Sequence, residues 1–202
     1  MNKATISFLS IALPLGLLTT LGGCFQAAPV RQYILITEPA AQALHQQAEP
    51  VTLLVGPVKL ASHLDQPRIV RRHGATRIDS LPGHQWAGNL TEMINNKLVA
   101  ELGALLKPYP VFTYPGPTSS LHGKKVAIDI LRFEGTESRS ATIEARWILS
   151  DIGSRSIIKT HSSVFHVPLA DDSYEALTTA LSQGLSLLGQ EMAASILSER
   201  SE

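Results

Sequence analysis

Cysteine and an excess of charge are what this sequence lacks most. Its 202 residues include one cysteine, Cys24, so no disulfide can form within the chain and packing alone must stabilise it. Lysine and arginine together number 17, as do aspartate and glutamate, so the charges balance. Because proteins that bind nucleic acid need a clustered basic surface, this balance argues against nucleic acid as the main partner.

Signatures of catalysis are missing as well. None of the seven histidines falls in an H-E-x-x-H motif or another ligand-spaced cluster, and the chain has no G-x-S-x-G elbow, P-loop or dinucleotide-binding glycine motif. Asp171 and Asp172 could bind a metal, but a helix N-cap explains them better, and residues 115–117 suit a rigid turn. The sequence therefore predicts a protein that is not an enzyme, with no catalytic residues and no metal.

The N-terminal residues have the three-part layout of a secretory signal. Lys3 supplies a positive start, residues 6–20 are apolar but interrupted by a proline, and small residues precede Cys24. The apolar stretch is too short and too broken to span a membrane permanently. We therefore expect residues 1–23 to be a cleaved signal peptide.

The run Leu-Gly-Gly-Cys that ends this segment resembles the lipobox of bacterial lipoproteins. In proteins with this box, the cysteine carries two acyl chains on sulfur and a third on the amine that cleavage frees. The resemblance implies that Cys24 is lipidated, that residues 24–30 form a lipidated tether and that covalent acyl chains take the place of any cofactor. Phe25, where many inner-membrane lipoproteins have aspartate, favours the periplasmic face of the outer membrane of a Gram-negative bacterium. The alternative is an ordinary signal peptide beside a chance cysteine, or a free buried thiol.

Residues 31–202 are enough for one domain with a real core and rather short for two. Apolar runs bounded by turn residues predict strands at residues 32–37, 51–58, 68–72, 76–79, 111–114, 124–134, 141–150 and 156–167. In residues 141–150, Ile143, Ala145, Trp147 and Leu149 share one face, as in an antiparallel strand with one face in the core.

Two longer segments predict amphipathic helices. Residues 85–106 carry an apolar stripe that begins at Trp86, and a second helix follows the capping residues 171–173. Together these elements predict an α+β fold: a single domain with a mostly antiparallel sheet and two long amphipathic helices packed on one face. Trp86 and Trp147 are predicted to be structural. The stripe of the second helix comprises Tyr174, Leu177, Leu181, Leu185, Leu188, Met192 and Ile196.

Two segments suit an interaction surface. Residues 57–72 place basic groups around a short apolar stretch, and residues 114–120 form a loop. In the alternative, the arginines are solvated or paired with Asp65 and Asp79, and Trp86 fills the core. The candidate docking residues are His63, Asp65, Arg68, Arg71, Arg72 and Tyr114.

Taken together, these segments resemble the PqiC (paraquat-inducible protein C) family of ABC-type transport auxiliary lipoproteins. No single motif is specific, but their order and spacing along the whole mature chain are. The matching pieces are the Cys24 lipobox, Tyr33-Ile34-Leu35, residues 56–65, residues 69–72, residues 84–90, Phe133-Glu134, Ala145-Arg146-Trp147 and the helix of residues 174–196.

The resemblance implies a non-enzymatic outer-membrane component of an intermembrane lipid transport system that supports membrane integrity. In such systems an inner-membrane protein with MCE domains, of the PqiB type, forms a hydrophobic tunnel across the periplasm. The lipoprotein docks at its far end, as a ring-shaped homo-oligomer. A covered path is needed because each methylene group exposed to water costs about 0.8 kcal/mol. An ATPase is implied only by analogy.

Two other functions stay open on the sequence alone. The protein could carry a single lipid in a cavity of its own, or it could be a structural lipoprotein that ties the envelope together. Composition by itself reaches only a lipid-anchored periplasmic α+β domain.

Overall fold

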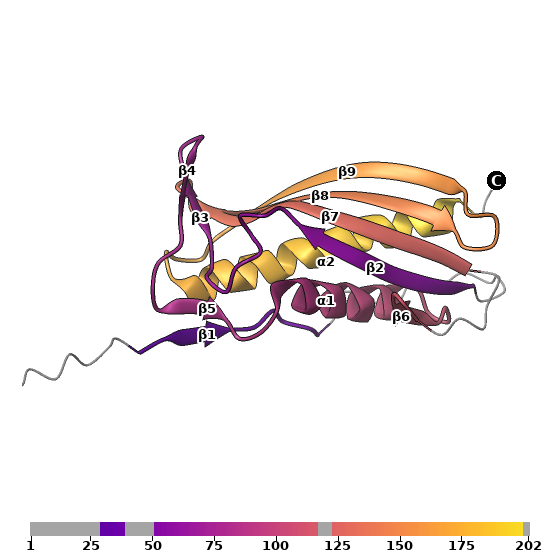
Figure 1. Cartoon of the computed structure of the whole chain (residues 1–202), viewed down its shortest axis with the longest axis horizontal. Helices are drawn as coiled ribbons and strands as arrows, with labels where there is room; N and C mark the ends of the chain where they lie inside the picture. Colours follow the sequence, from indigo (N-terminus) through magenta and orange to yellow (C-terminus); the bar gives the residue numbers. More distant parts are fainter. Residues whose placement is uncertain (1–28, 39–50, 117–122, 200–202) are drawn as a thin grey trace, which may run out of the picture.

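The computed structural model describes residues 29–38, 51–116 and 123–199 (Figure 1). The predicted signal peptide, Cys24, the tether up to residue 28 and residues 117–120 of the predicted loop lie outside the described residues. The strands are β1 (Arg31–Tyr33), β2 (Thr52–Leu60), β3 (Arg71–His73), β4 (Arg77–Asp79), β5 (His84–Trp86), β6 (Val111–Thr113), β7 (Gly123–Thr136), β8 (Ser140–Asp151) and β9 (Ile157–Pro168), and the helices are α1 (Leu90–Leu105) and α2 (Tyr174–Ser198).

The larger sheet has seven strands and is built on β7. β8 pairs antiparallel with β7, and β9 pairs antiparallel with β8. On its other edge β7 pairs in parallel with β2 and then with β3, while β6 lies beyond β2 and β4 beyond β3. The predicted α+β class is confirmed. The antiparallel character belongs to β7, β8, β9 and the β3–β4 hairpin, whereas the parallel pairing of β2 and β6 makes the sheet mixed.

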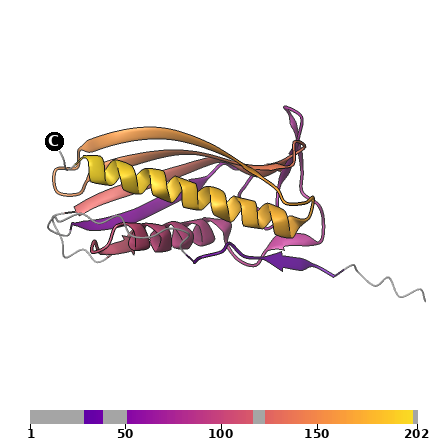
Figure 2. The same ribbon diagram turned by 180° about the vertical axis from the view of Figure 1, so that it is seen from behind.

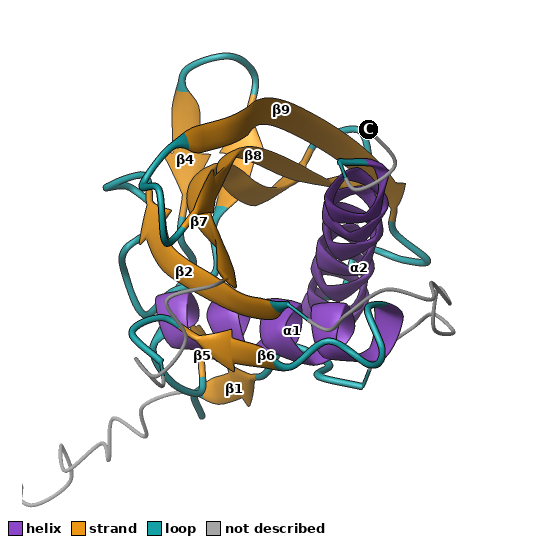
Figure 3. Cartoon of the chain, turned by 90° about the vertical axis from the view of Figure 1, so that its right-hand side faces the viewer, coloured by secondary structure: helices purple, strands orange, loops and turns teal. Residues whose placement is uncertain are grey.

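Both helices cover the same face of this sheet, which curves around them (Figures 2 and 3). The predicted alternation in β8 is confirmed, since Ile143, Ala145, Trp147 and Leu149 are fully buried beneath the helices. α2 comes so close to β8 that a Cβ atom on Gly184 would lie 2.1 Å from Ile143 Cδ1. A side chain at this position would therefore force Ile143 or the helix to shift where the helix crosses the strand.

The C-terminal helix forms where the sequence predicts it. Ser173 caps it, with its Oγ accepting a hydrogen bond from the amide of Ala176 (3.0 Å). All seven residues of the predicted stripe are buried. The stripe thus supplies the apolar layer that packs on the sheet.

The N-terminal boundary of the other helix was predicted wrongly. α1 begins at Leu90, not at residue 85, because Asn89 caps it by accepting a hydrogen bond from the amide of Glu92 (3.1 Å). Trp86 instead ends β5, which pairs in parallel with β1 in a separate two-stranded sheet. Trp86 fits the apolar spacing of the predicted helix because, as the last residue of β5, it points into the same core.

The elements divide the molecule into two ends along its long axis. Figure 1 places the start of β1 and the β3–β4 hairpin at one end, and β6 and the β8–β9 connection at the other. In the sequence, Cys24 precedes β1. The predicted docking residues fall at both ends, because residues 63–72 lie near β3 and Tyr114 follows β6.

Candidate docking surfaces

A buried carboxylate holds part of the predicted docking segment. Glu134 on β7 is fully buried, and Arg72 binds it with two hydrogen bonds, from Nε to Oε1 and from Nη2 to Oε2. Arg132 Nε donates to the same carboxylate (2.8 Å), and His63 Nε2 lies 3.8 Å from it. Arg72 therefore fastens β3 to β7. We call His63, Arg72, Arg132 and Glu134 the Glu134 cluster.

The cluster keeps the carboxylate ionised. Burial is the largest single influence on Glu134 and would raise its pKa, but the hydrogen bonds and charges of Arg72 and Arg132 together outweigh it. The pKa of Glu134 is consequently below its ordinary value of 4.5. Two arginines surround the one buried carboxylate and compensate its charge, so removing Glu134 would leave both guanidinium groups without this partner.

Arg71 takes part in a stack of aromatic rings at the start of α2. Its guanidinium lies 4.6 Å from the centre of the Tyr174 ring and donates to the carbonyls of Asp172 (2.8 Å) and Ser173 (3.2 Å). The ring of His84 stacks on Tyr174 at 3.8 Å. The carbonyls near the N-cap of α2 are thereby tied to β3.

Arg72 pairs with an acidic residue, as the alternative expects, but that residue is neither Asp65 nor Asp79. Arg72 pairs with Glu134, whereas Asp79 forms ion pairs with His73 (3.1 Å) and Arg77 (3.5 Å) in the described part of the chain. The alternative chose acidic residues that are close in sequence to the arginines. In the folded chain β7 lies between β3 and β8, which brings Glu134 of β7 beside Arg72.

The remaining residues of the segment stay at the surface. Asp65 and Arg68 are exposed. Asp65 lines a hollow of about 450 Å³ together with Trp86 and residues 87–90, and Arg68 bridges to Gln85 of β5. Of the predicted docking residues in this segment, these two are the most exposed, whereas His63, Arg71 and Arg72 are half-buried. The docking role of the segment stays a prediction.

Both tryptophans are buried, as core residues should be. Trp86 is 5% exposed, and its ring lies 6.0 Å from that of Phe133. Trp147 is fully buried, donates from Nε1 to Ser163 Oγ (3.1 Å) and stacks on His161 at 4.6 Å. Trp147 thus has a partner for its N–H as well as for its ring.

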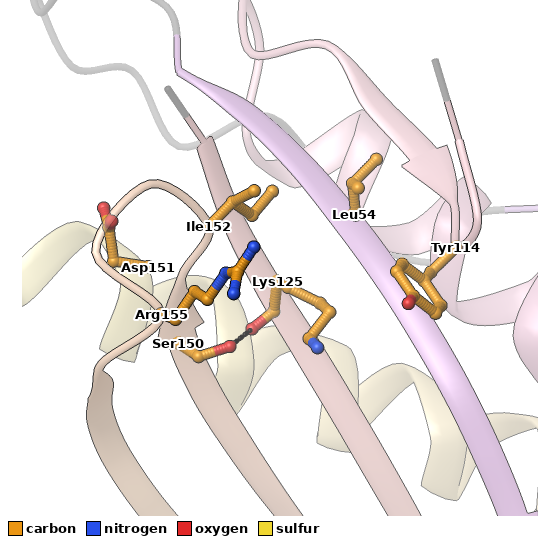
Figure 4. Close-up of a pocket in the computed structure, with 7 residues that line it drawn as sticks. All are labelled: Leu54, Tyr114, Lys125, Ser150, Asp151, Ile152 and Arg155. Carbon is orange, nitrogen blue, oxygen red and sulfur yellow. Dashed lines mark hydrogen bonds between the residues drawn. The ribbon is translucent and has the colours of Figure 1, made fainter. Parts of the chain in front are cut away.

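Tyr114 belongs to a hollow of about 340 Å³ at the opposite end of the molecule, which we call the Tyr114 pocket (Figure 4). Tyr114 is 41% exposed, and its amide donates to the carbonyl of Val55 (2.8 Å), which fixes it beside β2. The other residues that line the pocket are Leu54, Lys125, Ser150, Asp151, Ile152 and Arg155.

The lining of the Tyr114 pocket combines apolar side chains with two cations. Lys125 Nζ lies 5.1 Å from the centre of the Tyr114 ring, and Arg155 extends toward the same space from the β8–β9 hairpin (Figure 4). Asp151 is bound within its hairpin, because its Oδ1 accepts from the amide (2.7 Å) and the hydroxyl (2.9 Å) of Ser154. These hydrogen bonds lower the pKa of Asp151. Within the described ranges, neither cation forms an ion pair with a carboxylate.

Sequence reasoning missed Glu134, Arg132, Lys125 and Arg155 as members of these sites. Glu134 was recognised only as part of the Phe133-Glu134 segment that resembles the family, and nothing local distinguishes it from the other charged residues of β7. Lys125 and Arg155 carry no local signal, since β7 and the β8–β9 hairpin meet only in the folded chain.

Neither a metal site nor a membrane span is found in the described residues. No three His, Cys, Asp or Glu side chains there come together as a metal ion would require. Neither of the two helices there has the combination of length and hydropathy needed to cross a bilayer.

Comparison with known proteins identifies a family. Residues 33–193 match the model of the family described as "ABC-type transport auxiliary lipoprotein component". Protein XCC0632 from Xanthomonas campestris has a similar crystal structure, with a TM-score of 0.67 at 22% identity over 84% of this chain and 95% of its own. A crystal structure of an uncharacterized protein gives 0.66 at 20% identity, over 77% and 98%. No curated protein matches the sequence.

The two solved structures share the fold, while the family match spans most of the sequence. The order of motifs that resembles PqiC agrees with that match. This chain belongs to the family of ABC-type transport auxiliary lipoproteins.

Proposed function

We propose that this protein is a lipid-anchored auxiliary component of an MCE-type intermembrane lipid transport system, on the periplasmic face of the outer membrane. The observation that carries the proposal is the family match over residues 33–193. The lipobox at Cys24 supports the anchor. A protein in this role needs no catalytic group, only a tether, a rigid sheet and surfaces that bind its partners.

The Tyr114 pocket is the surface we assign to the tunnel protein. It combines an exposed aromatic ring with two cations that have no carboxylate partner within the described chain. Tyrosine and arginine side chains are enriched at protein interfaces, so Tyr114 and Arg155 are the members of the pocket that favour this assignment. The arginines of residues 71–72 are less suitable, because both are engaged within the domain.

Photo-crosslinking in intact cells tests this assignment. Benzoylphenylalanine replaces Tyr114 in one variant and Val164, which is 51% exposed on β9, in the matched control. We expect an MCE-domain protein to be crosslinked at position 114 and not at position 164. Replacing Lys125 and Arg155 together by alanine should reduce that product.

Other products would point elsewhere. Recovery of cell-wall or outer-membrane components alone at both positions would contradict the transport assignment and favour a structural lipoprotein. A ring-shaped homo-oligomer predicts crosslinks between copies of this chain and a purified assembly larger than a monomer. A protein that stays monomeric at high concentration in detergent would contradict the ring.

A further inference from the structure

The first described segment is apolar on both of its faces. Tyr33 and Leu35 are buried, at 8% and 3% exposure, whereas Ile34 and Ile36 between and beyond them are 69% and 46% exposed. Val30, on the same face as Ile34 in an extended chain, is 53% exposed. A surface strand normally alternates apolar residues with polar ones, so this segment has an apolar stripe, Val30, Ile34 and Ile36, that the fold does not use.

The surface around the stripe is apolar and basic. Gln32 pairs with Gln85, which bridges to Arg68, so that Arg68 lies on the same face as the stripe. Leu81 is 52% exposed and comes two residues before Gly83, whose carbonyl accepts from the amide of Arg31 (2.8 Å). The exposed side of residues 30–36 thus has a guanidinium on the same face, and an exposed leucine lies close to Gly83, which pairs with Arg31.

The stripe is held firmly by its other face. The carbonyl of Tyr33 accepts from the amide of Ala87 (2.8 Å), and the amide of Ile36 donates to Ser182 Oγ on α2 (3.1 Å). Lys97 Nζ on α1 donates to the carbonyl of Glu38 (3.1 Å). The exposed side chains therefore belong to a fixed surface of the domain and not to a loose tail.

We propose that this stripe, with Arg68 and Leu81 beside it, rests on the phospholipid surface to which the protein is anchored. The inference depends on the proposed lipidation of Cys24. The described chain begins at Pro29, five positions after Cys24. Even a fully extended chain of that length could separate the two residues by at most about 18 Å. Acyl chains in the bilayer would hold β1 at its surface, where apolar side chains enter the interface and arginine meets lipid phosphates.

Two other exposed apolar residues do not have this setting. Ile157 and Val164 are 65% and 51% exposed, but they belong to β9, which lies on the opposite side of the molecule from β1 (Figures 1 and 3). Isolated exposed apolar residues of this kind are common on soluble proteins. They provide a matched control.

A fluorescent label at a single position tests the contact. The lipidated full-length protein is reconstituted in vesicles of phosphatidylethanolamine and phosphatidylglycerol, with an NBD label on Ile34→Cys in one variant and on Val164→Cys in the control. Acylated Cys24 has no thiol to react, so the label enters only at the introduced cysteine. We expect emission at position 34 to shift to shorter wavelength and to be quenched by doxyl-labelled phospholipid, with neither effect at position 164.

Three results would overturn the proposal, and they are distinguishable. A wavelength shift at position 34 without doxyl quenching would mean that another protein surface, such as a second copy of this chain, covers the stripe. No change at position 34 in protein that floats with the vesicles would reject the contact and leave the lipid anchor intact. Protein that does not float with the vesicles would reject the anchor itself, and with it the contact.

Discussion

Replacing Glu134 by glutamine should destabilise the domain by about 2–3 kcal/mol. The substitution keeps the size of the side chain but removes the charge that Arg72 and Arg132 share, and it turns an amide N–H toward guanidinium donors. Removing one member of a buried ion pair typically costs about 3–5 kcal/mol. The lower value applies because the side chains of Arg72 and Arg132 are 20% and 30% exposed, so water can solvate them.

Urea unfolding of the domain without its signal peptide measures this loss. The fluorescence of the two buried tryptophans reports the transition, and the ring of Trp86 lies 6.0 Å from that of Phe133, next to Glu134. For a domain of this size the expected loss corresponds to a fall in Tm of about 4–12 °C. Glu137→Gln is the control, because that carboxylate is 59% exposed and its loss should change stability by less than about 0.5 kcal/mol. If Glu134→Gln were as mild as the control, the cluster would not be holding the sheet.

Three further outcomes follow from the same structure. Because the pKa of Glu134 is lowered in the folded state, the stability that its carboxylate contributes is complete above pH 4.5 and is lost as the pH falls through the folded-state pKa. The wild type should therefore lose stability faster in acid than Glu134→Gln. Parallel curves of stability against pH would contradict this. Trp147→Phe, which removes the hydrogen bond to Ser163, should cost about 1–2 kcal/mol and Trp147→Ala about 3–5 kcal/mol by thermal unfolding, so equal losses would be unexpected. Gly184→Ala should cost about 1–3 kcal/mol by urea unfolding, with partial recovery on adding Ile143→Val, whereas a neutral effect would show that α2 can move away from β8.

The parts of the fold that depend on local periodicity could be predicted. The stripe of α2 and the alternation in β8 each arise within one element, so the sequence identifies their buried faces directly. The start of α1 was missed although a signal existed, since Asn89 followed three residues later by Glu92 is a capping pattern. The apolar Trp86 outweighed that pattern in the prediction.

The docking surfaces depend on long-range pairing and could not be predicted in the same way. The Glu134 cluster needs β3 to lie beside the end of β7, and the Tyr114 pocket needs the β8–β9 hairpin to lie near β6. Nothing in residues 63–72 indicates that Arg72 binds Glu134, which lies 62 positions along the chain. The sequence shows a basic run but not which of its members are engaged within the domain: Arg68 is exposed, whereas Arg72 binds Glu134.

The attachment of β1 to α2 has a consequence for the order in which the chain can fold. Tyr33 donates to Glu175 (3.3 Å) and Ile36 to Ser182, contacts between residues 142 and 146 positions apart. An exported chain emerges N-terminus first, so the strand nearest the anchor has to wait for the last helix before it can pack. Contacts of such separation form slowly, and folding stays incomplete until they do. A chain that ended before Tyr174 would leave β1 without the helix it packs on, so a packed β1 indicates that synthesis and export have reached α2.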